Sequence, residues 1–168
     1  MDPVRENKNL TDNKMTNKAE KDGGLSNGME KIIVHSDGGA RGNPGPSAIG
    51  VFVENEKGEV LEEFKEYIGE STNNIAEYMA VLRGLMMLKA RFGQKTKKVA
   101  LDWKLDSELV VKQLSGEYKV KNPGLQPLHA QIQDLRVEFA GVTFTHVRRE
   151  LNKEADRLVN EALDALKE

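Results

Sequence analysis

Cysteine is absent from this chain of 168 residues. Disulfide bonds and thiolate metal sites are therefore excluded, so any bound metal would be held by oxygen ligands. The absence of cysteine also fits a reducing compartment, and we expect a cytoplasmic protein.

Long apolar runs are absent as well. No stretch approaches the roughly 20 apolar residues that a membrane-spanning helix needs. The most apolar helical segment is interrupted by Arg83 and Lys89, and the N-terminus lacks the apolar core of a signal peptide. We therefore expect no membrane partner.

A large excess of charge is also missing, because the formal net charge is only -2. The chain is not a polycation, so a nucleic-acid partner would have to be bound by a local basic patch or by metal ions. The length predicts one domain. Residues 1–29 are rich in Asn, Lys, Asp and Thr. They predict a disordered N-terminal tail before a single domain at residues 30–168.

The apolar periodicity predicts three strands, a long amphipathic helix, and then two strand-helix units of which the first carries an extra helix. Such an order indicates an α/β fold built on one mixed sheet. Trp103, Met86 and Met87 are assigned to the core. The expected strands are 31–34, 48–53, 60–68, 99–105 and 142–147; the expected helices are 73–88, 107–114, 125–135 and 152–167.

The first strand leads into a glycine-rich stretch, from His35 to Ser47, that carries Asp37. Glycines beside Asp37 would let a metal ion or a nucleic-acid backbone approach closely. No Gly-Lys-Ser/Thr follows, which excludes a P-loop, and the next element is a strand, which excludes a dinucleotide-binding fingerprint. A plain turn without chemistry remains the alternative.

Three further carboxylates lie in similar settings: Glu77 and Asp156 begin helices, and Asp106 ends a strand. Each also has a structural interpretation. Asn74 and Glu77 have the spacing of a capping box, and Asp106 could be an N-cap, whereas Asn152 is the expected cap of the last helix. If all four acids converge on one edge of the sheet, their mutual repulsion calls for a divalent cation.

An all-carboxylate site favours Mg²⁺ or Mn²⁺ over Zn²⁺. Two such ions can activate a water and stabilise a leaving oxygen in phosphoryl transfer. Asp102 competes with Asp106 for the strand position. Asp106 is preferred because it sits at the strand end, where a site has room.

Four segments together resemble the type 1 ribonuclease H family: 36–46, 72–77, 106–110 and 152–156. The resemblance covers nearly all of residues 30–168. It implies a ribonuclease H-like five-stranded mixed sheet, with three antiparallel strands followed by parallel strands and with helices on both faces.

The resemblance further implies an endonuclease that hydrolyses the RNA strand of RNA/DNA hybrids with two Mg²⁺ ions, leaving 3'-hydroxyl and 5'-phosphate ends. Asp37 would bridge both ions. Asp156 would help to hold the ion that activates water, and Glu77 and Asp106 would hold the other. We expect a monomer.

The family's hybrid-contacting positions match a set of residues around the glycine-rich stretch and the start of the first long helix. Asparagine amides suit contacts with 2'-hydroxyl groups because they both donate and accept hydrogen bonds. The matching residues are Gly38, Gly39, Ala40, Arg41, Asn43, Asn73 and Asn74.

The chain departs from the family in two places. Many members carry a histidine in a loop before the last carboxylate, where this chain has Arg148-Arg149-Glu150-Leu151. Glu150 is a candidate substitute, whereas His146 comes earlier, on the strand, where a histidine is more often structural. The long basic protrusion of the family is reduced to Lys119 and Lys121, which together with Arg148 and Arg149 are candidates for phosphate contacts.

Two other functions remain open from the sequence. One is a related nuclease, such as an integrase or a junction resolvase, against which the glycine-rich loop and Asn73-Asn74 argue. The other is a catalytically silent hybrid-binding module, against which the presence of all four acids argues.

Overall fold

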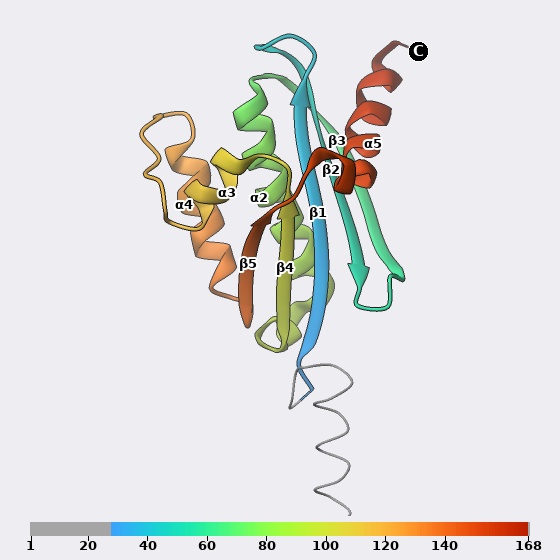
Figure 1. Cartoon of the computed structure of the whole chain (residues 1–168), viewed down its shortest axis with the longest axis vertical. Coiled ribbons are helices and arrows are strands. Elements are labelled where there is room, and N and C mark those ends of the chain that lie inside the picture. Colours follow the sequence, from blue (N-terminus) through green and yellow to red (C-terminus); the bar gives the residue numbers. More distant parts are fainter. Residues whose placement is uncertain (1–27, 168) are drawn as a thin grey trace, which may run out of the picture. The chain divides into compact units, whose positions relative to one another are not determined.

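The computed structural model describes residues 28–167, which form a five-stranded mixed sheet in the order β3-β2-β1-β4-β5 (Figure 1). β1 pairs antiparallel with β2, β2 pairs antiparallel with β3, and β4 pairs parallel with β5. The predicted α/β fold is confirmed, whereas the predicted tail at residues 1–29 lies almost wholly outside the described residues. The elements are β1 (Glu30–Ala40), β2 (Gly45–Asn55), β3 (Val60–Ser71), α2 (Asn73–Phe92), β4 (Val99–Leu105), α3 (Glu108–Leu114), α4 (Gln126–Arg136), β5 (Gly141–His146) and α5 (Lys153–Asp164), with short 3-10 helices at Gly93–Lys98, Arg149–Leu151 and Ala165–Lys167.

Helices cover both faces of the sheet, as expected. On one face α2, α3 and α4 enclose the main core, in which Trp103 is fully buried. On the other face α5 packs on β2 and β3. Gly50 of β2 permits this packing, because a Cβ there would overlap the carbonyl oxygen of Ala155 in α5. The sheet is thereby buried on both sides at its centre, which explains the consecutive apolar residues of β1 and β2.

β1 extends further than the sequence indicated. The predicted strand stopped at Val34 and gave way to a turn, but in the structure Gly38, Gly39 and Ala40 continue the strand in register with Ile49, Ala48 and Ser47. The glycine at position 38 is required by packing, since a Cβ there would overlap the backbone of Ala76 in α2. The extended strand therefore lies directly against the start of α2.

The first long helix corrects one core assignment. Met87 packs against the core, but Met86 is 46% exposed, so its assignment to the core was wrong. Met86 and Met87 are adjacent and therefore point about 100° apart on a helix, so only one of them can face the sheet. Among the described residues, no helix is both long enough and apolar enough to span a bilayer.

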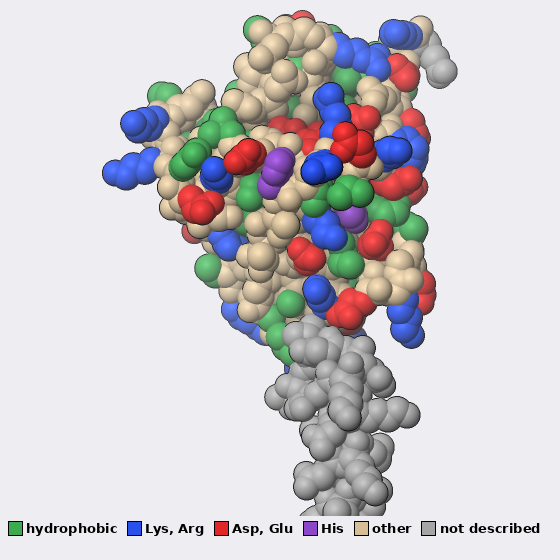
Figure 2. Space-filling model, viewed as in Figure 1, with side chains coloured by type: hydrophobic (Ala, Val, Ile, Leu, Met, Phe, Trp, Pro, Cys, Tyr) green, Lys and Arg blue, Asp and Glu red, His purple; other side chains and the backbone are tan. Residues whose placement is uncertain are grey.

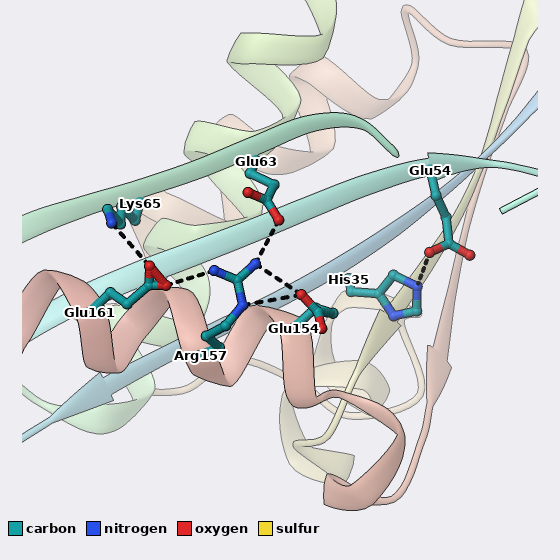
Figure 3. Close-up of polar contacts among 7 residues, drawn as sticks. All are labelled: His35, Glu54, Glu63, Lys65, Glu154, Arg157 and Glu161. Atoms are coloured by element: carbon teal, nitrogen blue, oxygen red, sulfur yellow. Dashed lines mark hydrogen bonds and ion pairs between the residues drawn. The ribbon is translucent and has the colours of Figure 1, made fainter. Parts of the chain in front are cut away.

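Ion pairs fix α5 across the sheet (Figure 3). Arg157 of α5 binds Glu63 of β3 as well as Glu154 and Glu161 of its own helix, and Lys65 of β3 binds Glu161. Each of these exposed pairs is screened by solvent and contributes little by itself, but three of them share the guanidinium group of Arg157. These contacts help to set where Asp156, the neighbour of Arg157, lies above the sheet.

Candidate active site

Three of the four predicted carboxylates form a cluster near the carboxyl ends of the interior strands β1 and β4. Asp37 lies within β1, Asp106 follows the end of β4, and Glu77 lies in the second turn of α2. One carboxylate oxygen from each lies within 4.8 Å of the other two. Asp156, in the first turn of α5, lines the same cavity.

Glu77 and Asp106 are not the caps of the helices that begin near them. Thr72 caps α2, its hydroxyl accepting a hydrogen bond from the N–H of Ile75 at 3.2 Å. Ser107 caps α3 in the same way. The capping-box interpretation of Glu77 and the N-cap interpretation of Asp106 are therefore wrong. Asn152 occupies the N-cap position of α5, but its side chain makes no capping bond.

A surface cavity of about 290 Å³ contains the cluster. Its lining includes all four acids and most of the predicted hybrid-contacting positions, but Asn43 and Asn74 lie outside it and are exposed. The lining residues are Asp37, Gly38, Gly39, Ala40, Arg41, Asn73, Glu77, Asp106, Arg149, Asp156, Val159, Asn160 and Leu163.

Burial and mutual repulsion oppose ionisation of the innermost acids. Burial, followed by the charge of Asp106, raises the pKa of Asp37 to about 7. Burial and the charge of Asp37 also hold the pKa of Glu77 well above its usual range. At an effective dielectric of about 20, two carboxylates at such a separation repel each other by roughly 3 kcal/mol. The repulsion between these carboxylates therefore destabilises the site unless a cation offsets it.

A divalent cation fits this arrangement. Oε2 of Glu77 is buried and has no hydrogen-bond partner among the described residues, although unpaired buried carboxylate oxygens are costly. Together with Asp37 and Asp106 it offers a hard cation three oxygen ligands without any nitrogen or sulfur. Asp102, the competitor of Asp106, does not line the cavity and is not in the cluster.

Two asparagines connect the glycine-rich stretch to the start of α2. Oδ1 of Asn43 accepts a hydrogen bond from the N–H of Asn73 at 3.0 Å, and Oδ1 of Asn73 accepts one from the N–H of Ala40 at 2.9 Å. Because both side-chain oxygens are engaged within the protein, their NH₂ groups are the parts that can donate to a ligand.

Several cavity residues were not singled out as site residues by the sequence, namely Val159, Asn160 and Leu163 of α5. Helical spacing was the signal that could have found Asn160, since it lies four residues after Asp156 and therefore on the same face. Arg41 is held at the rim by an ion pair with Asp164 at 2.7 Å.

His146 and Glu150 both lie outside the carboxylate cavity. His146 is exposed at the end of β5 and does not line the cavity. Glu150 lines a separate pocket with His35 and Glu54, and it is Arg149 that faces the carboxylates.

Lys119 and Lys121 line a third depression beside α3. On the face shown in Figure 2, basic and acidic side chains are intermixed, in agreement with the small net charge.

Comparison with known proteins places these features in a family. Residues 25–162 match the family model described as reverse transcriptase-like. The bifunctional protein Rv2228c of Mycobacterium tuberculosis is 42% identical over 136 residues, which are 80% of this chain and 36% of that protein. The chain thus spans about a third of the length of this curated relative. Ribonuclease HI of Halobacterium salinarum is 37% identical over 134 residues, covering 80% of this chain and 65% of that protein.

Solved structures give the same result. LC11-RNase H1, isolated from compost by a metagenomic approach, has 48% sequence identity and a TM-score of 0.79, with 83% of this chain and 100% of that chain covered. The same protein in complex with an RNA/DNA hybrid has a TM-score of 0.78 at 47% identity, with 82% and 99% covered. With a matching family model over most of its length and these relatives, the chain belongs to the type 1 ribonuclease H family.

Proposed function

We propose that this chain is an endoribonuclease that hydrolyses the RNA strand of RNA/DNA hybrids with two Mg²⁺ ions, for which Mn²⁺ can substitute. The observation that carries the proposal is the three-carboxylate cluster, in which a buried Glu77 oxygen lacks a partner. The hybrid complex of LC11-RNase H1, a protein that shares this fold at 47% identity, supports the choice of substrate.

The four acids have different parts in this proposal. Asp37, Glu77 and Asp106 would hold one ion with their clustered carboxylate oxygens, and Asp37 would also serve the second ion together with Asp156. Ions bound there would supply a water nucleophile near neutral pH and would stabilise the leaving oxygen. Attack by water in line with the scissile bond leaves 3'-hydroxyl and 5'-phosphate ends.

The neighbouring residues bind and orient the RNA strand. The backbone of Gly38, Gly39 and Ala40 is accessible from the cavity, and the side-chain NH₂ groups of Asn43, Asn73 and Asn74 are donors suited to 2'-hydroxyl or phosphate oxygens. Arg41 and Arg149 place positive charge beside the carboxylates, where a phosphate would pass. We further propose that the catalytic domain spans residues 30–168 and acts as a monomer in the cytoplasm.

The test is gel-resolved cleavage of a labelled RNA/DNA hybrid in Mg²⁺ by the wild-type chain and by Asp37→Asn, beside all-DNA and all-RNA duplexes. We expect cuts in the RNA strand of the hybrid that disappear in the variant. If the folded wild-type chain cuts nothing in either Mg²⁺ or Mn²⁺, the nuclease proposal fails and a silent hybrid-binding module takes its place.

A further inference from the structure

A buried polar network lies directly behind Asp37. Ser36, the preceding residue of β1, is fully buried, and its hydroxyl accepts a hydrogen bond from Nε1 of Trp103 at 2.8 Å. The carbonyl oxygen of Ser36 accepts a second one, from Nδ2 of Asn152 at 3.0 Å. Ser36 is therefore held through its side chain from β4 and through its carbonyl oxygen from the start of α5.

Asn152 connects two of the proposed metal ligands through their main chains. Its side chain holds the carbonyl that precedes Asp37, and its own carbonyl oxygen accepts a hydrogen bond from the N–H of Asp156 at 3.2 Å. Thr72 and Ser107, at the corresponding positions of α2 and α3, use their side chains to cap their own helices. The side chain of Asn152 instead reaches across to β1.

The burial of Asn152 argues that this connection is its main contribution. The residue is 1% exposed, and its Oδ1 has no partner among the described residues. A buried amide with an unpaired oxygen costs free energy that an apolar side chain would not. The feature that distinguishes Asn152 from an apolar residue is its N–H donation to the strand that carries Asp37.

We propose that Asn152 is a positioning residue, which fixes the separation of Asp37 and Asp156 and so preorganises the site for divalent cations. The hydrogen bond from Trp103 holds the side chain of the same Ser36 from β4. The inference rests on the proposed function, because it assumes that these two acids bind metal. Ligand side chains must be held to within about 0.5 Å to bind an ion well, and polar groups behind the ligands commonly provide this.

The test compares Asn152→Ala with Gln113→Ala in the full chain. Gln113 is a suitable control because it is also a buried amide, accepts a hydrogen bond from Tyr78 at 2.7 Å, and does not line the carboxylate cavity. Urea unfolding without metal measures the stability of each variant, and calorimetric titration with Mg²⁺ measures metal affinity without any nuclease assay.

Both variants should unfold at lower urea concentration than the wild type, because each loses a buried hydrogen bond. Only Asn152→Ala should raise the dissociation constant for Mg²⁺, by about tenfold or more; Gln113→Ala should stay within about twofold of wild type. Should Asn152→Ala fail to fold, Trp103→Phe, which keeps an aromatic ring but removes the N–H, should raise the dissociation constant by a smaller factor.

If a folded Asn152→Ala protein binds Mg²⁺ with wild-type affinity, the positioning role is overturned and the proposed metal site is unaffected. If Asn152→Ala does not fold, wild-type affinity in Trp103→Phe has the same consequence. No Mg²⁺ binding by the wild-type chain would instead overturn the proposed function, and the positioning role with it.

Discussion

At the scale of single residues, the helices beside the site are capped by residues other than its carboxylates. The side chains of Thr72 and Ser107 cap α2 and α3, so capping does not explain the positions of Glu77 and Asp106. Sequence spacing alone could not separate a capping acid from a ligand, because both stand at the start of a helix. Asp37 lies beside Asp106 because β1 is the neighbour of β4 in the sheet, and these two strands are far apart in the sequence.

The choice between the two acids of β4 can be tested directly. We predict that Asp106→Asn lowers the rate of hybrid cleavage by at least about a hundredfold, because it removes an oxygen ligand from the cluster. Asp102→Asn, the same substitution four residues earlier, should stay within about threefold of wild type since Asp102 does not line the cavity. The measurement is the single-turnover cleavage rate, and equal losses in the two variants would contradict the assignment.

The raised pKa of Asp37 predicts an unusual dependence of stability on pH. The folded chain holds this proton up to a pH of about 7, whereas an unfolded aspartate releases it near its ordinary value of 3.8. Between those values the folded state binds more protons, so the free energy of unfolding contributed by Asp37 falls as pH rises through this window.

Without metal, Asp37→Asn should therefore be more stable than wild type at neutral pH, by up to about 4 kcal/mol, and the difference should shrink toward pH 4. Urea unfolding of both proteins at a series of pH values, in the presence of a chelator, checks this. A difference that does not change with pH would show that Asp37 is already ionised in the folded protein.

At the scale of secondary-structure elements, the close approach of the β1 and α2 backbones brings Asp37 near Glu77. The strand β4 could be predicted because its apolar residues alternate with polar ones. The burial of β1 on both faces could be predicted because its apolar residues are consecutive. The extension of β1 through Gly38, Gly39 and Ala40 could not, because glycine is typical of turns and only the neighbouring α2 explains why a side chain is excluded there.

Gly38→Ala tests that contact. A Cβ at this position overlaps the backbone of Ala76, so β1 and α2 would have to separate, and we predict a loss of about 2 to 3 kcal/mol in the free energy of unfolding. Gly39→Ala is the matched control, because its Cβ would lie 3.5 Å from Val159, an ordinary contact, and its stability should remain within about 1 kcal/mol of wild type. Equal stability of the two variants in urea would contradict the packing argument.

At the scale of the whole molecule, the proposed function requires a chain with a net charge of -2 to bind a polyanion. The intermixed charges of Figure 2 give no broad basic face on the side shown, so binding depends on a few local cations and on metal ions. The sequence pointed to Arg148 and Arg149 alike, and only the structure separates them, since Arg149 lines the carboxylate cavity and Arg148 does not.

We therefore predict that Arg149→Ala raises the KM for a hybrid substrate several-fold and reduces the salt dependence of binding by about one charge, whereas Arg148→Ala has a smaller effect. Steady-state kinetics at several salt concentrations measure both quantities. An effect of Arg148→Ala as large as that of Arg149→Ala would show that the contact is a diffuse surface charge and not a group in the cavity.

The proposed function requires that Asp37, Glu77, Asp106 and Asp156 together direct water onto the RNA phosphate. The most direct test is the chemistry of the cut ends, determined on both sides of a cleavage site in a hybrid whose RNA strand carries a label. We expect 3'-hydroxyl and 5'-phosphate ends, because water is the nucleophile. Ends with a 2',3'-cyclic phosphate and a 5'-hydroxyl would contradict it, since they would show that the RNA's own 2'-hydroxyl had attacked.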